Sequence, residues 1–483
     1  MAYFHGVRAS EVSTSITPPV STTAGLPVVW GTAPVHLTED PGAYVNKPVI
    51  CYEYSEAVAA FGYSAEWDKY TLSEVMYSES QLYNVAPIVF VNVLDPSKHK
   101  TAVAEKAVPL VNGVATIADS VIKSSLKVKD GIGGTKLVEG EDYTAEWNDD
   151  GELVITDIAG GADSGLAAFA VSYDRVDASK VTKADIIGGI GTSGEAKGLE
   201  LAGSIYTLFS MVPGILAAPG WTHYPEVASV MKAKALSLCG LFRCIVLTDV
   251  DTGACRSYSA VNAWKNANSY TGTNQVVCWP CARNGDNVFH MSTHMLGAIG
   301  RMDYANQDVP YQSPSNIEMQ ATGLCLADGT EIALTLEQAN MLNGQGIVTG
   351  LNFNGGWKTW GNYTGAYPST TDPKDVFICV RRMFDWQYQT FILTYWQKVD
   401  KPLTKVLIKN IVDSEQIRLN GLTARGFLLG GDIKFLESEN PLTDLLQGII
   451  RFHVYITPPV PAQEIDAILE YDVNNFSSLF EAA

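Results

Sequence analysis

The strongest hydrophobic pattern lies in the last third of the chain, where large apolar residues return every three or four positions. The residues that share this spacing are Val376, Phe377, Val380, Phe384, Tyr388, Phe391, Ile392, Tyr395 and Trp396. The spacing predicts a helix over residues 374–397 with one broad apolar face that needs a partner surface. Thr370-Thr371-Asp372-Pro373 fits its start, because an N-cap side chain there precedes a proline at the first helical position.

A second helix and a strand are predicted after this long helix. Pro402 ends the first helix, since proline lacks a backbone N–H and disfavours helical geometry in the residue before it. The second helix carries a narrower apolar stripe made of Leu407, Ile408, Ile411 and Val412. Asn420-Gly421 is typical of its C-terminal stop. Between residues 449 and 456 the period changes to two, which predicts a strand with one buried face.

Two separate stretches of the chain show an alternation of helices and buried strands. In residues 25–97, strands are predicted at 27–33, 46–51 and 87–93, and helices at 55–61 and 71–83. In residues 181–345, helices are predicted at 199–210, 224–238 and 257–269, and strands at 213–220, 242–247 and 276–279. Repeated helix and strand units favour a parallel sheet with helices on its faces.

The residues between these stretches have a different texture. Residues 98–180 offer short strands separated by Gly and Asp turns, at 107–117, 126–128, 143–147, 153–155 and 169–173. Asn148-Asp149-Asp150-Gly151 is a strong hairpin signal between two of them. We therefore expect an inserted all-β domain, a small sandwich.

Both ends of the chain are predicted to be extended arms. The N-terminal arm, residues 1–24, contains one candidate strand followed by a Ser/Thr/Pro-rich linker, and the C-terminal arm, residues 462–483, has strand character from Leu469 to Phe476. The arm residues that we expect to contact other subunits are Phe4, Gly6, Val7, Val12, Leu469, Tyr471, Val473 and Phe476. A lone strand cannot satisfy its own backbone groups, so each arm should pair with an exposed sheet edge, in its own chain or in a neighbour.

An ordered set of short motifs in the last third resembles the C-terminal domain of contractile tail sheath proteins. This family occurs in phage tails, R-type bacteriocins and related injection machines. The motifs are Trp360-Gly361-Asn362, Asp372-Pro373, Val399-Asp400-Lys401-Pro402-Leu403, Leu407-Ile408-Lys409-Asn410-Ile411-Val412-Asp413 and Tyr455-Ile456-Thr457-Pro458-Pro459. The resemblance extends to both ends of the chain. At the N-terminus, His5-Gly6-Val7 is similar to the His-Gly-Val strand with which sheath proteins commonly open.

This resemblance implies a fold class that combines α/β and α+β domains. The implied divisions are an N-terminal arm (1–24), the first part of an α/β region (25–97), an inserted β-sandwich domain (98–180), a subtilisin-like α/β domain (181–345), a C-terminal α+β sheath domain (346–461) and a C-terminal arm (462–483).

The resemblance also implies function and partners. Copies of the chain would form a helical polymer of stacked hexameric rings around an inner tail tube, together with baseplate and tail terminator proteins. Contraction of this polymer would drive the tube through a target envelope, with neighbours joined by strand exchange. No cofactor, metal or nucleotide is needed for such work.

Arg381 and Arg382 interrupt the apolar face of the long helix, and two interpretations stay open. Both side chains can snorkel or face solvent. Alternatively, both contact an acidic inner tube through weak ion pairs that break as the sheath contracts.

Composition excludes several other functions. The formal charge of −19 repels phosphate backbones, so we expect no nucleic-acid binding. No run of apolar residues is long enough for a membrane span, so no membrane insertion is expected. The first residues lack a signal-peptide pattern, which predicts a product that is made in the bacterial cytoplasm and released by lysis. That absence also disfavours a secreted surface-layer protein or adhesin.

The eight scattered cysteines fit a reducing compartment, and we expect no disulfides. Cys278-Trp279-Pro280-Cys281 copies a redox spacing, but it follows a strand instead of opening a helix, so packing cysteines are favoured. Gly189-Ile190-Gly191-Thr192-Ser193-Gly194 has the spacing of a dinucleotide fingerprint without the preceding buried strand, which favours a turn.

A hydrolase is the main alternative function, because a subtilisin-like domain raises the possibility of a protease. Subtilases carry Asp, His and Ser in that order along the chain. Here Ser193 precedes Asp249 and both His290 and His294, which is the wrong order. The two histidines have the spacing of a helical metal pair but no clear third ligand, so a structural or surface role is favoured.

Overall fold

A mixed eight-stranded sheet forms the centre of the molecule in the computed structural model, which describes residues 24–148, 150–158 and 166–480. Its order is β2 (Val49–Cys51), β3 (Ile88–Asn92), β1 (Pro27–Gly31), β12 (Ile215–Ala217), β13 (Ile245–Asp249), β14 (Gln275–Cys278), β19 (Ile347–Asn352) and β20 (Trp357–Trp360). The strands from β3 to β19 run parallel, and β2 and β20 pair antiparallel at the two edges. Both α/β stretches of the sequence therefore build one sheet.

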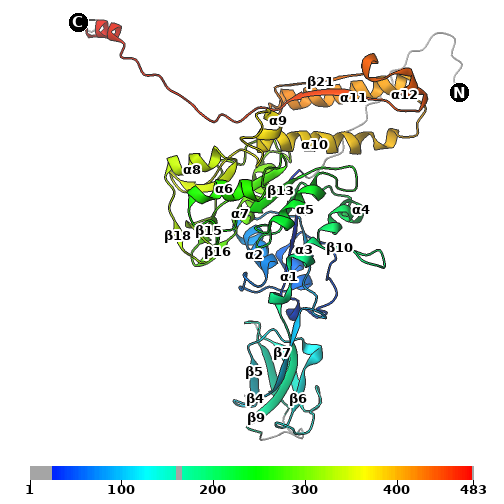
Figure 1. Cartoon of the computed structure of the whole chain (residues 1–483), viewed down its shortest axis with the longest axis vertical. Coiled ribbons are helices and arrows are strands. Elements are labelled where there is room, and N and C mark those ends of the chain that lie inside the picture. The colour runs from blue at the N-terminus through cyan, green and yellow to red at the C-terminus, as the bar shows by residue number, and fades with distance from the viewer. Residues whose placement is uncertain (1–23, 149, 159–165, 481–483) are drawn as a thin grey trace, which may run out of the picture.

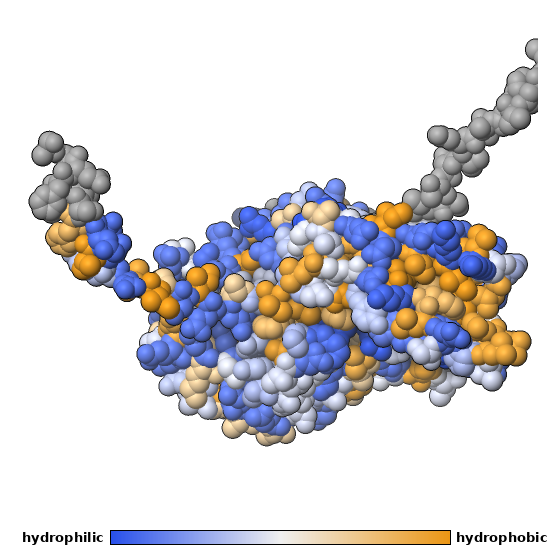
Figure 2. Space-filling model, turned by 90° about the horizontal axis from the view of Figure 1, so that it is seen from above, coloured by the Kyte–Doolittle hydropathy of each residue, from blue (hydrophilic) through white to orange (hydrophobic). Residues whose placement is uncertain are grey.

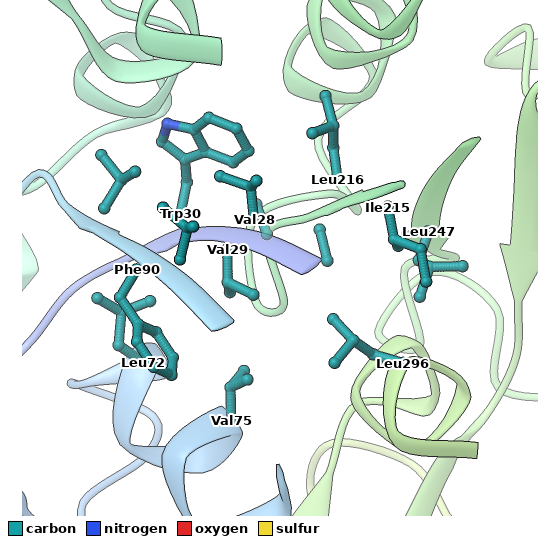
Figure 3. Packing of buried hydrophobic residues seen from close by; sticks show 14 of the residues in the cluster. Val28, Val29, Trp30, Leu72, Val75, Phe90, Ile215, Leu216, Leu247 and Leu296 are labelled. Carbon is teal, nitrogen blue, oxygen red and sulfur yellow. The ribbon is translucent and has the colours of Figure 1, made fainter. Parts of the chain in front are cut away.

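Helices cover both faces of this sheet (Figure 1). They are α1 (Tyr54–Phe61), α2 (Thr71–Tyr77) with its π-helical continuation η2 (Ser78–Tyr83), α3 (Lys183–Ile187), the 3₁₀ helix η5 (Gly198–Ser204), α4 (Ile205–Phe209), α5 (Pro225–Ala235), α6 (Tyr258–Ala267), α7 (Met291–Ala305) and α8 (Leu336–Asn343). Alternate residues of β1 point to opposite faces: Figure 3 shows Trp30 on one side and Val29 on the other, near Leu72 of α2 and Leu296 of α7. Burial on both faces explains why these strands are continuous apolar runs.

Smaller antiparallel sheets flank the central one. β10 (Gly189–Ile190) pairs with β11 (Ala196–Lys197), and a four-stranded sheet has the order β16 (Asn287–Phe289), β15 (Cys281–Asn284), β17 (Gly323–Cys325) and β18 (Glu331–Ile332). The glycine-rich stretch from Gly189 to Gly194 forms β10 and the turn that follows it in the β10–β11 hairpin, so the predicted turn is confirmed at residues 191–194.

The inserted segment forms two three-stranded antiparallel sheets with their own hydrophobic core. One sheet has the order β4 (Lys100–Pro109), β9 (Ala168–Val176), β6 (Lys127–Lys129), and the other β5 (Val114–Ile117), β8 (Leu153–Asp157), β7 (Tyr143–Trp147). It lies at the opposite end of the molecule from the C-terminal helices (Figure 1). The single strand predicted over residues 107–117 is wrong, because Asn112 and Gly113 take positive φ angles and turn the chain between β4 and β5.

We call residues 373–457 the C-terminal unit. It contains α9 (Pro373–Val376), α10 (Ile378–Tyr395), the 3₁₀ helix η6 (Trp396–Lys398), α11 (Lys405–Ala424), β21 (Gly430–Lys434), α12 (Leu442–Leu446) and β22 (His453–Thr457). The helix predicted over residues 374–397 is interrupted at Phe377, whose extended backbone bridges to Tyr363. The second helix continues past Asn420-Gly421, and the chain takes a positive φ only at Gly426, beyond its end.

The buried face of α10 differs from the predicted apolar one. Tyr388 and Trp396 are 43% and 60% exposed, whereas Gln387 and Gln389 are buried. Both glutamines have hydrogen-bond partners, since Gln387 Nε2 donates to Glu415 Oε1 at 2.6 Å and Gln389 Nε2 donates to the Arg243 carbonyl at 2.5 Å. Paired polar groups therefore occupy buried positions that lie outside the predicted apolar face.

Two boundaries also change. The central sheet extends beyond the boundary expected at residue 345, because β19 and β20 complete it. The final strand begins at His453 instead of residue 449, since the Arg451 N–H is bound by the Asn440 side chain at 2.7 Å and takes no part in the ladder.

Candidate functional site

The two-stranded sheet of the C-terminal unit presents one free edge. The register pairs Gly431 with Ile456 and Ile433 with Val454. On the outer side of β21, Gln416 bonds the Gly431 carbonyl at 3.0 Å and the Ile433 N–H at 3.1 Å. These β21 groups thus point away from β22, and in an antiparallel pair the same holds for Val454 and Ile456 opposite them. Among the described residues no strand pairs with this β22 edge.

The free edge has one apolar face and one polar face. Phe452, Val454 and Ile456 pack against a core that includes Leu419 and Ile433. On the other face, His453 and Tyr455 stack with ring centroids 4.2 Å apart. A strand added at this edge would find the same two faces, so alternating apolar and polar residues suit it.

The C-terminal segment leaves the C-terminal unit and extends away from the rest of the molecule (Figure 1). Gln463 bonds it to the body, since this side chain accepts from the Tyr363 hydroxyl at 2.7 Å and donates to Asn362 Oδ1 at 3.1 Å. No helix or strand forms from residue 458 to 472, and the 3₁₀ helix η8 (Val473–Phe480) follows. The strand expected from Leu469 to Phe476 is therefore not formed in the single chain, where this segment pairs with no sheet edge of the described residues.

The expected contact residues of this segment are accessible. Leu469 is 94% exposed, and Tyr471, Val473 and Phe476 are also mostly exposed. The four residues expected on the N-terminal arm, Phe4, Gly6, Val7 and Val12, lie outside the described residues.

Further apolar side chains are exposed on the C-terminal unit. Seen from above, the molecule shows hydrophobic patches at the surface of this unit (Figure 2). Leu429 beside β21 and both Leu442 and Leu446 of α12 are among the exposed large hydrophobic residues. Such a concentration is typical of a surface that contacts another protein.

Arg381 and Arg382 both form ion pairs within the chain. Arg381, 14% exposed, lies 2.9 Å from Asp385 and 3.3 Å from Asp375. Arg382 is only 3% exposed and pairs with Asp303 at the end of α7. Neither side chain snorkels to solvent, so that interpretation is wrong. Sequence analysis did not identify Asp303 as a functional residue, because no local pattern links it to Arg382, 79 positions away.

Asp249 and His290 lie close enough to interact electrostatically, but Ser193 is not brought together with them. Ser193 is exposed on the β10–β11 hairpin, while the buried Asp249 accepts hydrogen bonds from the N–H and hydroxyl of Ser292, at 2.9 and 2.5 Å. His290 Nδ1 lies 2.7 Å from Glu74 Oε2, and His294 Nδ1 lies 2.8 Å from the Tyr83 hydroxyl. Both histidines thus have structural partners.

The electrostatics of the His290 pair follow from its surroundings. Burial alone would lower the pKa of His290, but the Glu74 carboxylate raises it to about 9. Burial would likewise raise the pKa of Glu74, and His290 brings it below the ordinary value. The pair links α2 to the start of α7 across the core.

The cysteines have packing roles. All eight are free, and all except Cys239 are buried. Burial raises the pKa of the Cys278 and Cys281 thiols well above the ordinary value, which opposes thiolate chemistry. In the described part of the chain, no group of three or more His, Cys, Asp or Glu side chains could hold a metal ion. No helix within the described ranges is long and apolar enough to cross a membrane.

Comparison with known proteins reveals similarity over nearly the whole chain. No protein-family model matches it. The tail sheath protein of Burkholderia phage BcepMu is 27% identical over 474 residues, which cover 96% of this chain and 95% of that protein. The tail sheath protein of Escherichia phage P2 is 24% identical over 59% of this chain and 69% of its own length.

Solved structures show the same fold. The contracted PVC sheath complex of an extracellular contractile injection system has a TM-score of 0.58 at 13% identity, covering 98% of this chain and 99% of that chain. The contracted helical sheath of the anti-feeding prophage has a TM-score of 0.55 at 15% identity, covering 97% of this chain and 99% of that chain.

Proposed function

We propose that this chain is a structural, non-enzymatic subunit of a contractile tail sheath, and that its copies polymerise helically around an inner tube and contract to drive that tube through a target envelope. The observation that carries this proposal is the combination, in one chain, of a free β22 edge and an exposed C-terminal segment.

Strand exchange between subunits joins these two features. Leu469, Tyr471 and Val473 occupy alternate positions, and acidic Glu470 and Asp472 lie between them. In an extended conformation the apolar three lie on one face, which matches the apolar face beside Val454 and Ile456 on a neighbouring copy. The N-terminal residues Phe4, Gly6, Val7 and Val12 supply the second arm, so that each subunit links to neighbours in two directions.

The assembly contains further partners. By analogy with the sheath complex and the six-fold symmetrised baseplate structure that the chain resembles, its copies form stacked hexameric rings and contact a baseplate. The inner tube protein and a tail terminator are the further partners that the family resemblance implies. The particle is a phage tail or an extracellular injection system. The parallel core of the central sheet, with helices on both faces, supports a subtilisin-like fold without its chemistry.

We retain the proposed contact with the inner tube for Arg381 and withdraw it for Arg382. The Arg381 side chain retains 14% exposure, whereas Arg382 has too little exposed surface to reach a partner. The weak ion pairs that a sliding contact needs are those of partly exposed groups. Charge reversal at Arg381 should reduce co-assembly of sheath and tube, and unchanged extended particles would reject this contact.

Electron microscopy of the purified protein tests the function, since long hollow polymers support it and discrete monomers contradict it. The strand-exchange step is tested by Leu469→Asp with Tyr471→Asp, which places charge on the apolar face of the C-terminal segment. Glu470→Ser with Asp472→Ser is the matched control on the opposite face of the same segment. We expect polymers from the control and none from the first variant; polymers from both would refute strand exchange by this segment.

A further inference from the structure

Ala24, where the described part of the chain begins, is held on both sides of its backbone by a carboxyl group and a guanidinium group. Its N–H donates to Asp308 Oδ1 at 2.9 Å, and its carbonyl accepts from Arg382 Nη2 at 3.2 Å. Asp308 follows α7, and Arg382 lies on α10. Two elements remote in sequence therefore hold one residue of the chain.

The charged groups are themselves fixed in place. Arg382 Nη1 donates to Asp303 Oδ1 at 2.9 Å and its Nη2 bonds Oδ2 of the same carboxylate, which makes a bidentate pair. Arg382 is 3% exposed and Asp303 is 2% exposed. A buried charge pair with this geometry holds its partners in one arrangement, because separating them would leave each charge uncompensated.

Two glycines let the backbone approach these groups. A Cβ at Gly25 would lie 2.8 Å from Asp303 Oδ2, and a Cβ at Gly214 would lie 1.9 Å from the Ala24 carbonyl oxygen. Neither glycine has a positive φ, so close approach is the reason that these positions lack a side chain. Gly214 directly precedes β12, so the central sheet also packs closely against the Ala24 backbone.

We propose that Asp303, Asp308 and Arg382 form a clamp on the Ala24 backbone, which fixes where the N-terminal arm leaves the body and so positions that arm for exchange with a neighbouring subunit. The inference rests on the proposed function for its second part. The two arginines of α10 then differ in role: Arg382 positions the arm from within the chain, and only Arg381 remains available to a partner.

The clamp matters because a tethered strand binds at an effective concentration set by the position of its anchor and the span of its linker. With Ala24 fixed, the linker begins at one point relative to α7 and α10. If the clamp opens, that point spreads over a larger volume, and fewer conformations of the arm reach the neighbouring edge.

Asp308→Ala is the main test, since it removes the acceptor for the Ala24 N–H at a partly exposed position. Asp308→Asn keeps an oxygen in the same place and should restore wild-type behaviour. Gly25→Ala opens the clamp independently, by pushing a methyl group against Asp303. Gln307→Ala is the control, because Gln307 lies in the same loop but accepts from Arg425 at 3.2 Å instead.

Two measurements on the full chain decide the matter. Hydrogen exchange followed by mass spectrometry reports the amides of Ala24 and Gly25, and sedimentation with electron microscopy reports polymer yield. We expect Asp308→Ala and Gly25→Ala to exchange these amides at least about tenfold faster, which is about 1.4 kcal/mol of lost protection, and to lose most of their polymers. Asp308→Asn and Gln307→Ala should show neither the faster exchange nor the loss of polymers.

The outcomes separate the clamp from the function. Unchanged exchange in both clamp-opening variants would overturn the clamp. Faster exchange with a normal polymer yield would overturn its positioning role. If the wild-type chain forms no polymers at all, the proposed function fails, and the exchange rates still judge whether the clamp exists.

Discussion

The buried pair between Arg382 and Asp303 gives the sharpest test of how the C-terminal unit is joined to the central sheet. Both side chains are almost fully buried, so water screens neither charge. Arg382→Gln leaves the Asp303 carboxylate without its partner, and removal of one member of a buried pair costs about 3–5 kcal/mol. Loss of the bond to the Ala24 carbonyl adds about 1 kcal/mol.

A double variant distinguishes the loss of the ion pair from the cost of leaving one buried charge without a partner. Asp303→Asn alone should destabilise by a similar amount, because it leaves the guanidinium unpaired. Arg382→Gln combined with Asp303→Asn removes both charges, so the losses should not add, and the double variant should be more stable than their sum by at least about 2 kcal/mol. Urea unfolding, followed by circular dichroism and tryptophan fluorescence, measures these free energies.

A matched exposed pair serves as the control. Lys434 and Asp432 lie 2.9 Å apart at 53% and 47% side-chain exposure, so Lys434→Gln should change stability by less than about 1 kcal/mol. If Arg382→Gln proves as mild as this control, or if the two single losses simply add, the structural role assigned to the buried pair is wrong.

Three other predictions concern pH and the arms. Glu74 raises the pKa of His290 to about 9 against the effect of burial, so the charged form stabilises the fold below pH 6.5 and this stabilisation is lost as the pH rises through 9. His290→Gln should therefore flatten the fall in melting temperature above neutral pH. A melting temperature that falls with pH as steeply as that of the wild type would contradict this. Burial raises the pKa of Asp308 from 3.8 to about 7, with Asp303 also raising it and Arg382 opposing, so the stability that Asp308 contributes falls as the pH rises from 3.8 to 7. Asp308→Asn should therefore be more stable than the wild type at about pH 8 and differ little from it at about pH 4. Equal effects at the two pH values would be evidence against the shift. Deletion of residues 1–15 should abolish polymers yet leave the circular dichroism of the folded core unchanged, and retained polymers would count against the N-terminal arm.

The central sheet was largely predictable, because its strands are buried on both faces. A run such as Val28-Val29-Trp30 has no polar position, and only a two-sided environment accommodates that. The helices between the strands fix the class of the fold in the same way. What the pattern could not reveal is that β19 and β20 join this sheet across the expected boundary, since pairing of distant strands leaves no local mark.

The C-terminal helix was harder to predict for a physical reason. Hydrophobic periodicity assumes that a buried position is apolar, yet Gln387 and Arg382 are buried with partners on α11 and α7. Each polar group is satisfied by a residue remote in sequence, so its burial depends on tertiary structure alone. The candidate contact residues of the C-terminal arm are exposed in the single chain, and their contacts with other subunits stay a prediction.

The exposed C-terminal segment follows from a near balance of energies. Fixing two residues of a strand costs about 2–4 kcal/mol in backbone entropy. Burying the one apolar side chain of that pair returns about 1.5–3 kcal/mol, and the new backbone hydrogen bonds add about 1 kcal/mol. One arm on one edge therefore binds weakly, which is why Leu469 can remain in water in the single chain. In a lattice where each subunit contributes two arms and an apolar surface, the contacts together bind tightly. After the first contact forms, every later contact is intramolecular and benefits from a high effective concentration. Loss of either arm should thus prevent polymers altogether instead of halving their number.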